Sequence, residues 1–342
     1  MFKWEKNLNE RIARYLPQLV WVLVTLIALF IRRGGLWHIS FDFQNQFYTD
    51  EIGYLHTPFY TMFIWLVSHI PVTPIRTVKM IISLFDFGVA AAAVVLIRDR
   101  LVGQGRKADI KKLLTCYALL LISPVVIENG LTWIHMDSIC FFMVLCAAIA
   151  LGRKKNMLAW ILLGAAAALQ MQYGVIFIAV MIGWSVKRRA AGPAAEAAPE
   201  VSAGQAASAA QTVATQAGAA GPAAGLAVIA VLNVIAGIWS GTDCLTGLYQ
   251  LVNWLVIDPG TGEVLGSLLI WLASMAAQYG YLIAVSTLIA VFLYTDGGAW
   301  ESDDIAAGSS GHKKIRCGTC LIWTAAICHV VLTIYLGWIL QQ

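Results

Sequence analysis

Long apolar runs alternate with short polar or basic segments along the chain. A transmembrane helix needs about 20 predominantly apolar residues, and shorter runs suffice within a bundle. Nine runs fit this pattern, at residues 17–31, 77–97, 114–128, 136–151, 157–170, 173–186, 223–240, 273–294 and 319–337. The pattern therefore predicts an all-α, polytopic transmembrane helix bundle with about nine spans.

Basic residues indicate which ends of these spans face the cytoplasm, because Lys and Arg concentrate in cytoplasmic loops. Of the 23 Lys and Arg residues, 19 lie in five segments: 1–16, 98–112, 153–155, 187–189 and 313–316. All five fall on one side of the membrane if the apolar run 58–70 is a helix on the outer surface that does not cross. The N-terminus is then predicted to be cytoplasmic, and the acidic segments face outward.

Composition agrees with a membrane protein, because 59% of the residues are hydrophobic, only 12% are charged, and the mean hydropathy is +0.74. A soluble domain has about 45–50% apolar and about 25% charged residues. These values exclude a cytosolic enzyme, a disordered protein and a nucleic-acid-binding protein. The seven cysteines form no disulfide pattern, and Cys317 and Cys320 are a lone CxxC pair that only weakly suggests zinc.

An Ala- and Gly-rich segment divides the chain. Residues 190–222 lack a periodic apolar stripe, which predicts a flexible cytoplasmic linker. It separates an N-terminal six-span module, 1–189, from a C-terminal three-span module, 223–342. Each module has one long outer segment, 33–76 in the first and 241–272 in the second, and the amphipathic stretch 246–257 within the latter suits an interfacial helix.

Polar residues that suit catalysis cluster on the predicted outer side. In the first outer loop, a carboxylate such as Asp42 can act as a general base at the membrane surface, or it is simply a solvated acid. In the second span, Lys79 and Asp86 are seven residues apart, so they share one helix face. Lys79 either meets a phosphate or forms with Asp86 an internal charge pair that locks two helices. Arg76, one turn before Lys79, either meets the phosphate as well or extends its charge to the lipid headgroups.

Two further clusters fall on the same side. Trp133, His135 and Asp137 precede the fourth span, where Asp137 either lines a sugar site or caps the helix. Gln172 lies in the polar turn 170–174, which separates the fifth and sixth spans. The convergence of these clusters on one face favours a site there.

The order of these motifs resembles the GT-C class of polytopic glycosyltransferases, in particular bacterial relatives of GPI mannosyltransferases and dolichyl-phosphate-glucose glucosyltransferases. The resemblance covers residues 36–186. It rests on an outer-loop acid, a Y-x-P-x-Y-like run, a basic residue seven before an acid, a P…WGQxD[SA]-like stretch and a KPQ-like turn. The matching positions are Asp42, Leu55–Tyr60, Lys79 with Asp86, Pro124 with Trp133–Ser138, and Gln170–Tyr173. Gln44 stands where a D-x-D motif has its second Asp.

The resemblance implies transfer of a hexose, with mannose or glucose as the first candidates, with inversion of configuration at the anomeric carbon. The donor would be a polyprenyl-phosphate sugar, and the acceptor would be linked to a lipid or a protein on the outer side of a bacterial plasma membrane. Asp42 would be the general base. The donor phosphate would be held by Lys79, Arg76 and Arg33. The sugar and acceptor pocket would be shaped by Gln44, His56, Tyr60, Asp86, Trp133, His135, Asp137 and Gln172. No metal ligand is assigned and no cofactor is expected, because a lipid phosphate is already a good leaving group and a divalent metal is often not needed; a divalent metal stays an open alternative. A membrane transporter or lipid flippase is the alternative, although such proteins place polar residues near the midplane.

Overall fold

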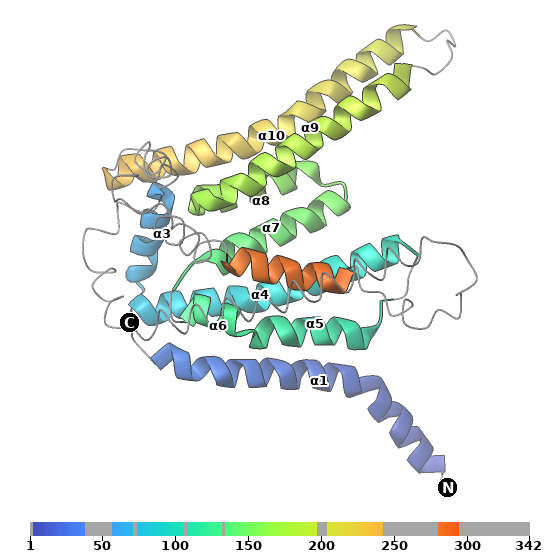
Figure 1. Ribbon diagram of the computed structural model, residues 1–342, viewed down its shortest axis with the longest axis vertical. Helices are drawn as coiled ribbons and strands as arrows, with labels where there is room; N and C mark the ends of the chain where they lie inside the picture. The colour runs from blue at the N-terminus through green and yellow to red at the C-terminus, as the bar shows by residue number, and fades with distance from the viewer. Residues whose placement is uncertain are drawn as a thin grey trace, which may run out of the picture. The chain divides into compact units, whose positions relative to one another are not determined.

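The computed structural model describes residues 3–37, 57–70, 74–105, 108–131, 134–196, 204–241 and 280–293. Within these ranges all regular elements are helices (Figure 1). The chain divides into two compact units. Unit 1 contains residues 1–45, 72–138 and 259–342, and unit 2 contains residues 46–71 and 139–258.

Unit 1 is built around two long antiparallel helices, α1 (Lys3–Trp37) and α4 (Pro74–Gly103), which contact each other. Helices α5 (Ile110–Ile122) and α6 (Pro124–Leu131) pack against both of them (Figure 1). A further helix, Gly280–Leu293, contributes Ala284, which packs on Val125 of α6. Between Ser123 and Pro124 the α5–α6 pair bends by 42°. Proline explains this break, because its ring disfavours helical backbone in the preceding residue and it has no N–H to donate.

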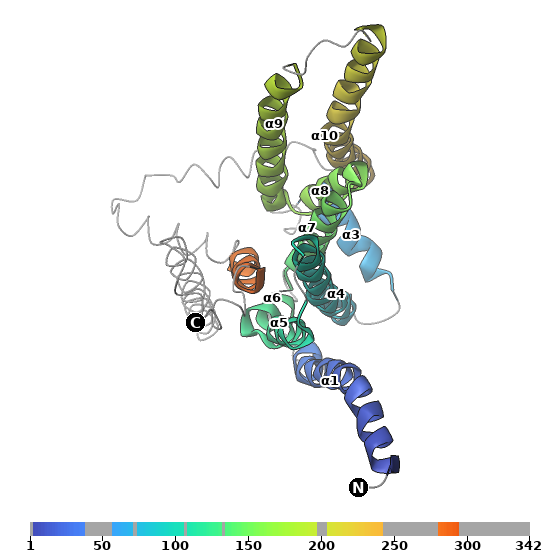
Figure 2. The same cartoon turned by 90° about the vertical axis from the view of Figure 1, so that its right-hand side faces the viewer.

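Unit 2 contains α3 (Pro58–Ser68), α8 (Asn156–Leu169), the short η2 (Met171–Tyr173), α9 (Gly174–Glu196) and α10 (Gly204–Ser240). Most of α7 (Asp137–Gly152) also belongs to it, and the boundary between the units falls within α7, after Ser138. Helix α8 packs against both α9 and α10 (Figure 2). The hydrophobic core of unit 2 includes Trp160, which contacts Phe177 edge to face. The same core contains Leu163 and the alanines 147, 150 and 159.

Three helices of the described chain are long and apolar enough to cross a membrane: Tyr15–Trp37, Ile75–Gly103 and Ala220–Trp239. The bent α5–α6 pair gives a fourth if it forms one span. This confirms the all-helical class and supports a membrane protein. The predicted spans 136–151, 157–170 and 173–186 coincide with apolar helices of 10–17 residues, as does the described part of 273–294. The span 319–337 lies outside the described ranges. The count of nine spans therefore stays a prediction.

The structure differs from the predicted linker and modules. Helix α9 continues to Glu196 and α10 already begins at Gly204, so much of 190–222 is helical. Alanine has the highest helix propensity, which explains how helices extend through a segment that has little to bury. The two units also combine segments from both sides of 190–222, and therefore do not coincide with the predicted modules. The predicted surface run 58–70 does form a helix, α3, of 11 residues.

Candidate functional site

A buried carboxylate, Asp86 of α4, lies at the centre of the polar interior of unit 1. Its exposed fraction is 1%, and that of Arg32 in α1 is the same. Arg32 Nη2 lies 3.4 Å from Asp86 Oδ2, and the Ser138 hydroxyl donates a hydrogen bond to Asp86 Oδ1. A charge taken out of water is tolerated when it is paired and hydrogen-bonded, and Asp86 meets both conditions. The carboxylate thereby links α1, α4 and the first turn of α7.

Arg32 holds more than this carboxylate. Its Nη1 donates to the Leu121 carbonyl at 2.7 Å, and to the Ala28 carbonyl at 3.5 Å. Its guanidinium also lies 5.1 Å from the centre of the Phe87 ring. The planar fork of arginine supplies several donors at fixed angles, which is why one side chain can join α1 to α4 and to the end of α5. The sequence prediction assigned no role to Arg32, and its position at the end of an apolar run, beside Arg33, gave no sign of which basic residue turns inward.

Two residues without a charge complete the surroundings of Asp86. Gly130 in α6 is so close that a Cβ there would lie 2.9 Å from Ile82 Cγ2 and 3.4 Å from Asp86 Oδ2. Tyr281, in the helix Gly280–Leu293 of the same unit, is 2% exposed. The glycine at position 130 therefore lets α6 approach the Asp86 carboxylate. Tyr281 was not among the residues predicted for the site.

A second polar group, Lys79 with Arg76 and Trp37, lies where α1 ends and α4 begins. The Lys79 ammonium donates to the Gly35 carbonyl at 3.2 Å, and Lys79 is 2% exposed. The Arg76 guanidinium lies 4.4 Å from the centre of the Trp37 ring. Both contacts follow from the antiparallel register of the two helices. Two of the three cations predicted to hold a phosphate are thus held at the same end of the α1–α4 pair.

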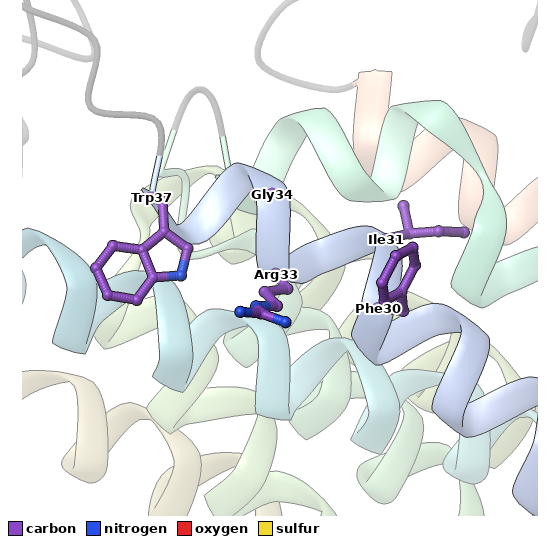
Figure 3. Close-up of a pocket in the computed structure, with 5 residues that line it drawn as sticks. All are labelled: Phe30, Ile31, Arg33, Gly34 and Trp37. Carbon is purple, nitrogen blue, oxygen red and sulfur yellow. The ribbon is translucent and has the colours of Figure 1, made fainter.

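The third cation, Arg33, lines an open groove of about 640 Å³. The groove is lined by Phe30, Ile31, Arg33, Gly34 and Trp37, all from the last turns of α1 (Figure 3). Its apolar wall and its cation lie on the same stretch of helix. A groove of this kind suits an amphiphile better than a soluble polar ligand.

The segment before α7 has a strained backbone. Ile134 has a φ of 54°, a left-handed conformation that is unfavourable for a β-branched residue. The His135 N–H donates to the Asn129 carbonyl at 3.0 Å, and Asp137 and Ser138 follow as buried residues. Such strain persists only when the surrounding structure fixes it, and it concentrates at functional positions. Four residues after Ile134, the Ser138 hydroxyl donates to Asp86.

Several buried polar atoms of unit 1 have no hydrogen-bond partner among the described residues. They are Ser83 Oγ, Ser123 Oγ, Glu128 Oε2, Asn129 Nδ2, and Nε of Arg32 and Arg76. Most buried polar atoms in proteins are hydrogen-bonded, so each of these calls for an explanation, such as an ordered water or a ligand. Ser83 lies one turn before Asp86 on α4, so the polarity of this interior extends beyond the Arg32–Asp86–Ser138 contacts.

The predicted site residues fall into three groups. Asp86, Asp137, His135, Lys79, Arg76 and Arg33 belong to unit 1, whereas Tyr60 and Gln172 belong to unit 2. The remaining four, Asp42, Gln44, His56 and Trp133, lie outside the described residues. Lys79 contacts Gly35, and Arg76 contacts Trp37.

Asp86 is paired with Arg32. This supports a charge pair that locks two helices, but the partner of Asp86 in that pair is Arg32 and not Lys79.

The predicted proline motif in unit 2 has a clear local role. Thr57 is the N-cap of α3 and Pro58 its first residue, and the Thr57 hydroxyl accepts from the Tyr60 N–H at 3.2 Å. The same hydroxyl donates to the carbonyls of Ala168 at 2.8 Å and Leu169 at 3.0 Å. Threonine at the cap and proline at the first position are favourable for starting a helix. The motif therefore begins α3 and fastens it to the end of α8.

Comparisons with protein-family models, with curated proteins and with solved structures give no match. Within the part of the chain that the structure describes, no three His, Cys, Asp or Glu side chains are grouped as a metal site would need.

Proposed function

We propose that this chain is a membrane hexosyltransferase that uses a polyprenyl-phosphate sugar as donor and works on the non-cytoplasmic side. The observation that carries the proposal is the grouping of Lys79 and Arg76 with Trp37 where α1 ends and α4 begins. The charge pattern puts this end of the helix pair opposite the basic cytoplasmic segments. Cations and an aromatic ring at a membrane interface suit a lipid-linked phosphate.

In the proposed reaction an acceptor hydroxyl oxygen attacks the anomeric carbon of the hexose. The bond from that carbon to the phosphate oxygen breaks, and its electron pair leaves with the polyprenyl phosphate. The hydroxyl proton passes to a carboxylate, which we assign to Asp42. Attack opposite the leaving group inverts the configuration. The role of Lys79 and Arg76 is to stabilise the negative charge that develops on the phosphate, and such electrostatic stabilisation is commonly the largest contribution to catalysis.

The Arg32–Asp86–Ser138 contacts support the proposal indirectly. They join α1, α4 and α7 inside unit 1, and Asp86 shares one face of α4 with Lys79. Their separation of seven positions corresponds to about 10 Å along a helix axis. We therefore assign Asp86 a positioning role for α4, and assign His135 and Asp137, on the adjoining strained segment, to the acceptor side of the same interior.

A transporter or lipid flippase is the alternative function, and the observation that favours it is the buried Arg32–Asp86 pair. Ionisable residues inside spans often mark the paths of ions or substrates. A transporter would move its substrate between compartments without forming a glycosylated product.

The test uses the purified full-length protein in proteoliposomes with a polyprenyl-phosphate hexose and a mixture of lipid acceptors. We expect Asp42→Asn to lower the rate of transfer by about 10²- to 10⁴-fold, since this is the usual contribution of a general base. We expect Lys79→Gln to raise the KM for the donor more than the KM for the acceptor. Arg98→Gln, which changes an exposed arginine at the other end of α4, is the control.

Absence of any glycosylated product from the wild-type protein, together with flux of the lipid across the bilayer, would establish the transporter alternative. Full activity of Asp42→Asn would remove Asp42 from the role of base. Equal effects of Lys79→Gln and Arg98→Gln would remove the phosphate role of Lys79.

A further inference from the structure

The groove on α1 differs from the buried interior of unit 1 in its exposure. Phe30 is 75% exposed and Trp37 is 64% exposed, whereas Lys79 and Asp86 are 2% and 1% exposed. Among the residues that the structure describes, the five that line the groove all belong to α1, and Lys79 and Asp86 are not among them. The groove therefore opens on the exposed side of α1, and it adjoins the Lys79–Arg76–Trp37 group through Trp37, which lines the groove and contacts Arg76.

The depth of the groove in the membrane follows from the length of the span. The apolar stretch of α1 runs from Tyr15 to Trp37, 23 residues, and the groove occupies its last two turns. A helix of this length just exceeds the hydrocarbon core of about 30 Å, so its end lies at the headgroup level. Tryptophan is enriched at that level, and arginine extends its charge toward it.

The chemistry of the lining is that of a phospholipid. In Figure 3 the Arg33 side chain lies between Phe30 and Trp37 along the same helix. Phe30 and Ile31 lie deeper in the hydrocarbon core and offer an apolar surface to acyl chains. Arg33 lies closer to the end of α1 and offers a positive charge to the lipid headgroups. A second guanidinium, that of Arg76, lies over the Trp37 ring. Arg33 in the described part of the lining and Arg76 beside it carry positive charge, which favours a headgroup with a net negative charge over a zwitterionic one.

Gly34 gives the groove its open centre. A Cβ at this position would have nothing within 4 Å, whereas one at the adjacent Gly35 would lie 2.6 Å from Leu131 Cδ1. A side chain at Gly34 would thus enter the groove without meeting another helix.

We propose that this groove binds an anionic glycerophospholipid of the surrounding bilayer, with its phosphate at Arg33 and its acyl chains along Phe30 and Ile31, so that Arg33, unlike Lys79 and Arg76, is not part of the donor site. The bound lipid is a component of the bilayer and is chemically distinct from a sugar donor. The proposal does not depend on whether the chain transfers a sugar.

The experiment measures phospholipid binding to the detergent-purified full-length protein by native mass spectrometry. Phosphatidylglycerol and phosphatidylcholine are titrated separately. We expect the wild-type protein to bind its first phosphatidylglycerol more tightly than phosphatidylcholine. We expect Arg33→Gln to weaken that first binding about five-fold, since one basic residue near a membrane surface contributes about 1 kcal/mol. Gly34→Leu fills the groove and should weaken it at least as much.

Gly103→Leu is the matched control, because Gly103 is an exposed glycine in a helix, and a Cβ there also has nothing within 4 Å. It should leave phosphatidylglycerol binding unchanged. Equal binding of the two phospholipids by the wild-type protein would overturn the proposal, as would unchanged phosphatidylglycerol binding in Gly34→Leu. If Gly34→Leu instead abolishes binding of polyprenyl phosphate while phosphatidylglycerol binding persists, the groove belongs to the donor and the proposal is wrong.

Discussion

At the scale of single residues, the pairing of Arg32 with Asp86 is the contact on which the interior of unit 1 depends most. Both side chains are 1% exposed, and neither can recover its hydration inside the bundle. The pair is close, at 3.4 Å, and the Ser138 hydroxyl and the Leu121 carbonyl satisfy further polar atoms. The attraction between the two charges offsets the cost of burying them, so removal of one partner should be far worse than removal of both.

Asp86→Asn is expected to destabilise the protein by about 3–5 kcal/mol, because it leaves the Arg32 charge buried without a counter-charge. The double variant Arg32→Met with Asp86→Leu should recover most of that loss, since it replaces both charges with apolar groups. Unfolding titrations in mixed detergent micelles measure both. Additive losses in the double variant would show that the two residues act independently.

At the scale of elements, glycines decide how closely α8 and α10 pack. A Cβ on Gly164 would overlap the Gly225 carbonyl and lie 3.0 Å from Gly225 Cα, and a Cβ on Gly225 would lie 2.8 Å from the Trp160 carbonyl. These neighbours are backbone atoms, which move only if a whole helix moves. Small residues allow such close backbone approach between helices in membranes.

Gly164→Ala is therefore expected to lower stability by about 1–3 kcal/mol, the usual cost of overpacking. The control is Gly183→Ala in α9, where a Cβ meets nothing within 4 Å. That variant should instead gain about 0.5–1 kcal/mol, because alanine loses less conformational entropy in a helix than glycine does. Thermal unfolding in detergent compares the two, and a loss of equal size in both would refute the packing argument.

At the scale of the whole molecule, the basic segments predict which face of the membrane each turn occupies. Within unit 2 two exposed positions test this rule. Lys155 lies in the basic turn between α7 and α8, and His69 follows the end of α3. The charge pattern assigns Lys155 to the cytoplasm and His69 to the outer side.

We expect a cysteine introduced by His69→Cys to react with a membrane-impermeant maleimide in intact cells. A cysteine introduced by Lys155→Cys should react only after the cells are permeabilised. The wild-type protein, with its own cysteines, supplies the background. Labelling of both variants in intact cells, or of neither, would contradict the predicted topology.

The sequence by itself determined the helical class, since apolar runs of this length have few other stable forms in a membrane. It also determined the start of α3 at Thr57 and Pro58, because capping and proline geometry are local effects. The bend at Pro124, by contrast, falls inside the run 114–128 that the hydrophobic pattern predicted as one span. The tertiary structure alone decided that Arg32, rather than its neighbour Arg33, pairs with Asp86, because one residue of helical rotation separates a buried arginine from an exposed one. It also decided that glycines 130, 164 and 225 lie at close contacts, because a glycine's neighbours across a helix interface are set by packing between segments far apart in the chain.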